Sequence, residues 1–190
     1  MTEEVDIRRE LRPGDLGAIV AHHGRLYSRE YGVDSTFEAR VASSVGRAAS
    51  RGFPSDREGI WIVDRDGRWS GCIAYTDEGQ GVAMVRWVLL DASLRGRGLG
   101  RRLLGELLAE VEAHGYRLVA LETFSDLRAA AHLYREHGFE VVGAEIGPRW
   151  GRDEITYQRY ELELPRSSRT NPARGAVADS TAPTAAARAA

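Results

Sequence analysis

The stretch LDASLRGRGLGRRLL, residues 90–104, decides the fold of this chain because it joins an expected strand to an expected helix. It holds three glycines and four arginines between two apolar runs. Glycines let the backbone bend so that successive N–H groups point into one concavity. The helix start adds unpaired amides and a partial positive charge. On glycine spacing alone, the junction predicts either a diphosphate pocket or a plain turn with surface arginines.

Two common phosphate motifs do not fit this stretch. The dinucleotide fingerprint requires G-x-G-x-x-G, whereas the glycines here are Gly96, Gly98 and Gly100. A Walker loop requires Lys followed by Ser or Thr after its last glycine, and the chain has Arg101-Arg102 there. Neither a Rossmann nor a P-loop site is therefore expected.

Hydrophobic periodicity around the junction predicts alternating strands and helices. Strands are expected at 5–10, on both sides of the Asp66-Gly67 turn within 59–77, and at 82–91, 118–123, 139–145 and 154–164. Helices are expected at 14–30, 35–50 with Ser35 as N-cap, from 99 to the HGY sequence at 114–116, and at 126–138. This order favours an α/β or α+β fold with one central sheet.

Composition narrows the class of protein. Lys and Arg total 26 against 28 Asp and Glu, so a nucleic-acid partner is not expected. A single cysteine, a charged N-terminus and the lack of an apolar run near the ~20 residues of a membrane span favour a cytoplasmic protein with no membrane partner. Residues 165–190 are rich in Ala, Pro, Ser, Thr and Arg, which predicts a disordered tail behind one domain at 4–164.

The junction also matches R-x-x-G-x-G from Arg95 to Gly100, and this resembles the acetyl-CoA pyrophosphate loop of the GNAT N-acetyltransferase superfamily. The stretch LETFSDLRAAAHLYREHGFEVVG at 121–143 is similar to the next strand, helix and LY…GF signature of that superfamily. The motifs RPGDLG and QRYELEL resemble acetyltransferase domains fused to MarR-type regulators. The resemblance implies a mixed, mostly antiparallel twisted sheet of six to seven strands, with strands four and five splayed and about four helices.

The resemblance implies acetyl-CoA as cosubstrate and no metal. Backbone groups of the fourth strand would meet pantetheine, and the glycine loop would hold the pyrophosphate. Many relatives carry Asn where this chain has Leu127, so Ser125 is expected to replace that contact. The expected cofactor-binding residues are Val88, Leu89, Leu90, Arg95, Gly96, Arg97, Gly98, Leu99, Gly100, Arg101 and Ser125.

Acetyl transfer to an amine requires a base for the ammonium and benefits from an acid for the leaving thiolate. By resemblance, Tyr134 is the expected acid, although its helical spacing would also suit a core aromatic. Glu122, twelve residues earlier, is the expected base, with a peripheral strand carboxylate as the alternative. Glu30, His22, His23 and water are the other candidate bases.

The sequence thus predicts an N-acetyltransferase that uses direct attack in a ternary complex. A non-catalytic acetyl-CoA sensor is the alternative. The acceptor is expected to be a small-molecule, peptide or protein amine, and the enzyme a possible homodimer. The acidic residues Glu30, Asp34, Glu38, Asp77 and Glu78 suit a cationic acceptor, although charged helix faces are usually just solvated.

Overall fold

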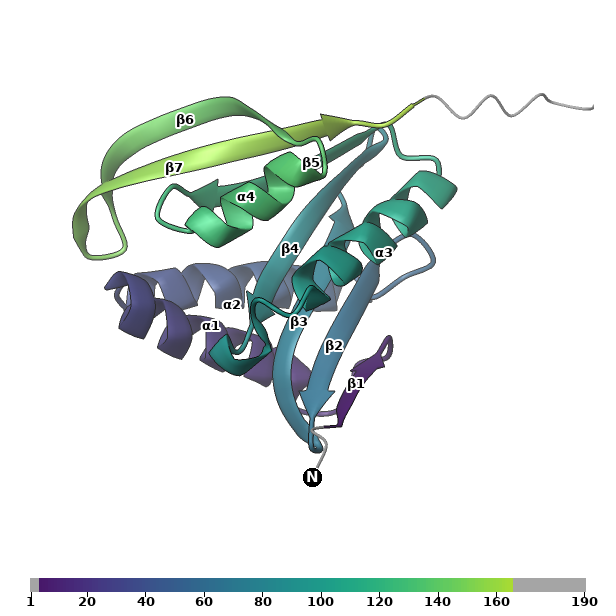
Figure 1. Ribbon diagram of the computed structural model, residues 1–190, viewed down its shortest axis with the longest axis horizontal. Coiled ribbons are helices and arrows are strands. Elements are labelled where there is room, and N and C mark those ends of the chain that lie inside the picture. Colours follow the sequence, from purple (N-terminus) through teal and green to yellow (C-terminus); the bar gives the residue numbers. More distant parts are fainter. Residues whose placement is uncertain (1–3, 166–190) are drawn as a thin grey trace, which may run out of the picture.

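A computed structural model describes residues 4–165, so the predicted tail lies outside the described residues except for Pro165. Its elements, drawn in Figure 1, are β1 (Val5–Arg8), α1 (Asp15–Tyr31), α2 (Ser35–Ser50), β2 (Gly59–Arg65), β3 (Arg68–Asp77), β4 (Val82–Leu90), a 3₁₀ turn (Ala92–Leu94), α3 (Leu99–Ala113), β5 (Leu118–Phe124), α4 (Arg128–Glu136), β6 (Glu140–Arg149) and β7 (Arg152–Glu163). The expected mixed, mostly antiparallel fold is confirmed.

One seven-stranded sheet runs through the molecule in the order β1-β2-β3-β4-β5-β7-β6. Every neighbouring pair is antiparallel except β4 and β5, which are parallel. The β4–β5 pairing covers only Val82–Met84 against Leu118–Ala120. Beyond it, β5 continues along β7 while the rest of β4 pairs with β3 alone, so the sheet opens between its fourth and fifth strands.

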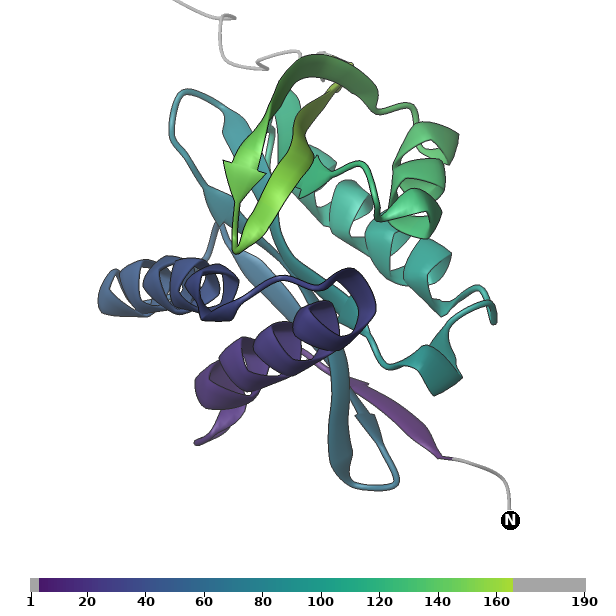
Figure 2. The same ribbon diagram turned by 90° about the vertical axis from the view of Figure 1, so that its left-hand side faces the viewer.

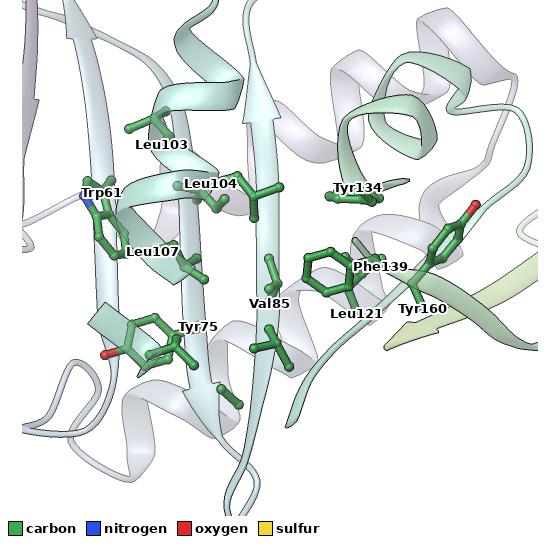
Figure 3. Packing of buried hydrophobic residues seen from close by; sticks show 14 of the residues in the cluster. Trp61, Tyr75, Val85, Leu103, Leu104, Leu107, Leu121, Tyr134, Phe139 and Tyr160 are labelled. Carbon is green, nitrogen blue, oxygen red and sulfur yellow. The ribbon is translucent and has the colours of Figure 1, made fainter. Parts of the chain in front are cut away.

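The four helices form two layers, with α1 and α2 on one face of the sheet and α3 and α4 on the other (Figure 2). Alternate residues of one strand therefore enter different cores. Trp61 and Val63 of β2 pack in the cluster beneath α3, whereas Ile60 and Ile62 pack with α1 and α2. Figure 3 shows the α3–α4 side, where Leu104 and Leu107 face the sheet and Tyr134 lies beside Phe139.

A β-bulge in β4 changes which face of the sheet each following side chain points to. Cys72 is paired with Leu89 and Ala74 with Arg86, so β4 carries one residue more than β3 between the same rungs. The extra residue coincides with Trp87, whose φ of 50° is left-handed. Before the bulge, Ala83 and Val85 pack beneath α3; after it, Trp87 packs with α1 and α2. A bulge has this effect because side chains alternate along a strand.

Two local features differ from the expectations. The N-cap of α2 is Asp34, whose carboxylate accepts the Thr36 amide at 2.9 Å, so the expected Ser35 cap is wrong. Both residue types cap well, and here the carboxylate comes one residue earlier. The 3₁₀ turn after β4 has no counterpart in the sequence prediction. Within residues 4–165, no helix has the length and apolarity needed to cross a membrane.

We expect Leu107→Ala to lower the free energy of unfolding by about 2–5 kcal/mol, because it leaves a cavity in the core beneath α3. Leu107 has an exposed fraction of 0%. Urea unfolding would measure the change. Glu112→Ala, at an exposed site on the same helix, should stay within about 0.5 kcal/mol of the wild type. Equal effects of the two substitutions would contradict the packing described.

Candidate active site

A cavity of about 540 Å³ occupies the opening between β4 and β5. Its walls come from both helical layers and from the glycine loop before α3. Because it extends to both faces of the sheet, two ligands approaching from opposite sides could meet in the opening. The predicted residues that line it are Val88, Leu89, Leu90, Arg95, Gly96, Gly98, Gly100, Arg101, Glu122 and Tyr134.

The glycine loop forms a bare backbone cradle at the start of α3. Gly96 and Gly98 have left-handed φ values of 73° and 79°, and a Cβ at either would meet nothing within 4 Å. Gly98 is the N-cap and supplies no side-chain acceptor. The Arg102 amide donates to Gly98 O at 3.0 Å, one turn into the helix. Open space beside uncapped helix amides fits the diphosphate of a coenzyme A.

Two arginines flank this cradle, each held by a carboxylate. Arg95 donates to Glu30 Oε2 and to Leu90 O, both at 2.8 Å. Arg101 donates to both oxygens of Glu136 at 2.8 Å. The other two predicted loop residues, Arg97 and Leu99, do not line the cavity, and Leu99 packs against the core beneath α3.

The β4 wall is fixed by side chains that bond to its carbonyls. The Cys72 thiol donates to Trp87 O at 2.9 Å, and Tyr27 donates to Val88 O at 3.4 Å. Trp87 Nε1 donates to Ser44 Oγ at 3.3 Å, which ties the bulge to α2. The left-handed conformation is unfavourable for a tryptophan, so Trp87 needs these contacts from three elements to hold it in place.

Tyr134 enters the cavity from α4 and is only 4% exposed. Its ring packs against Phe139 and Tyr160, with ring centroids 6.0 Å away in each case. Burial raises the pKa of Tyr134 above its usual value, so the phenol stays protonated at neutral pH. The side chain is therefore a core aromatic that carries a protonated hydroxyl on the cavity wall.

Tyr27 of α1 is a cavity residue that the sequence analysis missed. It stacks on Phe37 with centroids 4.7 Å apart. Burial, and secondarily the nearby Tyr134, raises the pKa of Tyr27. The sequence gives no signal for it, because Tyr27 and Tyr31 have the i, i+4 spacing typical of a packed helix face.

Glu122 lies on the wall formed by β5, with one oxygen bonded and the other less engaged. Its Oε2 accepts from Arg40 at 2.9 Å and from Tyr157 at 2.7 Å. Its Oε1 is 3.9 Å from Arg159 Nη1, beyond hydrogen-bond distance. The carboxylate is thus oriented by α2 and β7, while Oε1 remains open to an incoming donor.

The alternative bases are less well positioned. Glu30 does not line the cavity and is bound to Arg95, and His22 packs against Trp69 with centroids 4.4 Å apart. His23 does line the cavity, with Nδ1 2.7 Å from Ile19 O. Burial lowers the pKa of His23 to about 4, so it is neutral at pH 7 but a weak proton acceptor.

Ser125 is the predicted cofactor residue that lies apart from the cavity. It is exposed, and its amide donates to Thr156 O at 3.0 Å. After Phe124 the chain turns away from the cavity. Leu127 lines the cavity instead of Ser125. The expected polar contact from Ser125 is therefore not supported.

Arginines line the α2 side of the cavity, and the five acidic residues singled out from the sequence lie outside it. None of Glu30, Asp34, Glu38, Asp77 and Glu78 lines this cavity. Arg40 and Arg47 of α2 and Arg86 of β4 line it instead. Several of those carboxylates are engaged elsewhere, as Asp34 is in capping α2 and Asp77 in binding Arg57. Among residues 4–165, no cluster of three or more His, Cys, Asp or Glu side chains could hold a metal ion.

The model of the acetyltransferase (GNAT) family matches residues 25–139, which span α1 to α4 and include the glycine loop and Tyr134. The chain therefore belongs to this family, and it is an acyltransferase. The superfamily expected from the sequence is confirmed, and acetyl-CoA is the donor that this family uses.

Two relatives and one solved structure are similar to this chain, and the structure, at 18% identity, shows the fold alone. L-amino acid N-acyltransferase MnaT of Escherichia coli is 26% identical over 166 residues, which cover 82% of this chain and 93% of that protein. An uncharacterised Mycobacterium leprae protein is 44% identical over 66 residues, but these span only 17% of its length. A putative acetyltransferase of Salmonella typhimurium, solved with acetyl-CoA, has a TM-score of 0.62 at 18% identity and covers 94% of this chain and 99% of that one.

We expect Gly98→Glu to raise the Kd for acetyl-CoA at least about tenfold, because a carboxylate at the cradle repels the diphosphate and removes charge-assisted bonds. Isothermal titration calorimetry would measure the affinity. Gly105→Glu adds the same charge within α3, where a Cβ also meets nothing within 4 Å, and should bind normally. Unchanged affinity in a folded Gly98→Glu protein would contradict the role given to the cradle.

Proposed function

We propose that the protein is an N-acetyltransferase that moves the acetyl group of acetyl-CoA to a primary amine of a small molecule, by direct attack in a ternary complex. One observation carries the proposal: the cavity joins the two faces of the sheet through the β4–β5 opening. The glycine loop and Tyr134 lie on the α3–α4 side, and Glu122 is bonded to Arg40 of α2 on the other. Donor and acceptor can thus be bound together.

On the donor side, the backbone amides at Gly96–Arg101 bind the diphosphate, and the β4 edge from Val88 to Leu90 orients the pantetheine arm. Acetyl-CoA supplies an activated acetyl thioester. The cradle's open glycines and uncapped helix amides support this assignment. Arg95 and Arg101 place guanidinium donors at its rim, each already paired with a carboxylate, Glu30 and Glu136.

On the acceptor side, the ammonium must lose a proton before its nitrogen can attack. Glu122 Oε1, the oxygen that Arg40 and Tyr157 leave open, takes that proton directly or through one water. As the carbon–nitrogen bond forms and the carbon–sulfur bond breaks, Tyr134 gives its proton to the departing thiolate. The position of the phenol on the cavity wall supports this role, and its raised pKa keeps it protonated until the thiolate forms.

The acceptor is a small-molecule amine, because one cavity of about 540 Å³ has to receive both the acetyl end of the donor and the acceptor. The name of the E. coli relative, which describes an acyltransferase of L-amino acids, also supports this acceptor class. The link to MarR-fused domains and a homodimer stay predictions. A non-catalytic sensor would bind acetyl-CoA in the same cradle and acetylate no amine.

We expect Tyr134→Phe to lower kcat by about 10²–10⁴-fold while acetyl-CoA affinity is retained, because the ring still packs and only the proton donor is lost. Steady-state release of free CoA thiol would measure it. Tyr116→Phe removes a hydroxyl that bonds to Arg57 O away from the cavity, and should keep full turnover. If Tyr134→Phe turns over normally, Tyr134 only packs.

We expect Glu122→Gln to weaken or remove the acid limb of the pH–rate profile and to regain activity at high pH, where the amine loses its proton without help. The neutral amide keeps the size of the side chain but cannot accept the proton. Glu112→Gln, at an exposed site on α3, serves as the charge-matched control. An unaltered profile in Glu122→Gln would assign the proton to another group or to water.

A further inference from the structure

The acceptor side of the cavity carries a polar strip along α2. Arg40, Ser44 and Arg47 are spaced i, i+4 and i+7, so they share one face of the helix, and all three line the cavity. Arg86 faces them from β4, one residue before the bulge. Ser44 accepts the indole N–H of Trp87, so the strip is anchored at the bulge itself.

The three arginines differ in how their charge is balanced. Arg40 is paired with Glu122 at 2.9 Å, and Arg86 with Glu78 at 2.9 Å. Arg47 donates to the neutral Ser43 Oγ at 2.8 Å, and no carboxylate between residues 4 and 165 lies within ion-pair distance of it. Arg47 therefore adds an unbalanced positive charge to the acceptor wall.

A smaller pocket of about 100 Å³ adjoins the main cavity at this point. The two cavities share Ser44, Arg47 and Arg86, and Arg51 adds a third guanidinium to the smaller one. The Glu78 carboxylate, bound to Arg86, also lines the smaller pocket, and Arg51 lies 3.6 Å from Glu58, so the charge of Arg47 is the one left for a ligand. Its volume suits one small polar group, since a water occupies about 30 Å³ in the liquid. The donors around it suit an anion, because guanidinium groups bind carboxylates in a planar fork.

Arg47 also lies close to the expected site of transfer. It is three residues beyond Ser44 on α2, which corresponds to about 4.5 Å along the helix axis. Ser44 in turn contacts the β4 bulge beside Val88 and Leu89. An acidic group bound at Arg47 could therefore belong to a small molecule whose amine reaches the β4–β5 opening.

We propose that Arg47, together with Arg86, forms an anion subsite that recognises a carboxylate on the acceptor, so that the substrates are amines bearing an acidic group rather than polyamines or other cationic amines. This inference rests on the proposed function. The aromatic residues Phe37, Trp87 and Trp150 that line the same region suit an apolar body between the two polar ends.

The test compares three acids, L-leucine, L-phenylalanine and glycyl-L-phenylalanine, each with its own carboxamide, so that the two members of a pair differ only in the carboxylate. Spermidine represents the cationic amines. Thiol release from acetyl-CoA gives kcat/KM for each. A carboxylate keeps a nearby ammonium protonated more strongly, so the carboxamides are intrinsically the more reactive amines near neutral pH. We expect at least one acid to be preferred over its carboxamide by about tenfold or more, as for a charge-assisted hydrogen bond.

In Arg47→Gln the KM for that acid should rise by about tenfold, while the carboxamide and the acetyl-CoA affinity stay unchanged. The control is Arg25→Gln, which removes an exposed arginine of α1 outside the cavity and should alter neither substrate. Equal use of acids and carboxamides, a preference for spermidine, or an equal loss on both substrates in Arg47→Gln would overturn the subsite.

Calorimetric binding of the same acids and carboxamides to the CoA-loaded protein separates this inference from the proposed function. Preferential acid binding that is lost in Arg47→Gln, without turnover, would support the subsite and contradict the N-acetyltransferase proposal. Turnover of amines with no preference for acids would support the N-acetyltransferase proposal and contradict the subsite. Binding of neither the acids nor their carboxamides, again without turnover, would contradict both.

Discussion

The extra residue at Trp87 in β4 is the constraint on which the site depends. In a regular strand, β4 would keep its alternation and could continue along β5, closing the sheet. The left-handed Trp87 shifts the alternation by one, so a tryptophan that would have packed beneath α3 packs against α1 and α2. The β4–β5 ladder stops after three residue pairs, and the cavity occupies the space that further pairing would have filled. Hydrogen bonds with Cys72, Tyr27 and Ser44 stabilise this unfavourable backbone conformation.

The opened sheet divides the chemistry between its faces. The α3–α4 layer supplies helix amides and a protonated phenol, which suit a phosphate-bearing donor and a leaving thiolate. The α1–α2 layer supplies Arg40, Arg47 and aromatic rings, which suit a compact acceptor. Glu122 connects the two because it is on β5 yet is oriented by Arg40 of α2 and Tyr157 of β7. A change in the position of α2 would thus move both the acceptor wall and the candidate base.

Local pattern predicted the parts of the site that consist of consecutive residues. The strand, glycine loop and helix at 82–113 could be predicted because glycine spacing and leucine periodicity are local signals, and Tyr134 because it is part of a local signature. Ser125 does not line the cavity, because its amide pairs with Thr156 of β7, and no local pattern encodes that pairing. Tyr27, Arg47 and Arg86 come together only through helix–sheet packing. The position of the five acidic residues outside the cavity could not be predicted for the same reason, since sequence does not reveal which charges are already paired.

The single cysteine of the chain, Cys72, lies beneath the bulge and is 1% exposed. Its thiol donates a hydrogen bond to Trp87 O. Burial also raises the pKa of the thiol, so little reactive thiolate forms in the folded protein. A chromogenic disulfide reagent added to the folded enzyme consequently registers only the coenzyme thiol set free by transfer. One further equivalent per chain becomes accessible when the bulge opens, which makes Cys72 a built-in chemical reporter of the integrity of that strand.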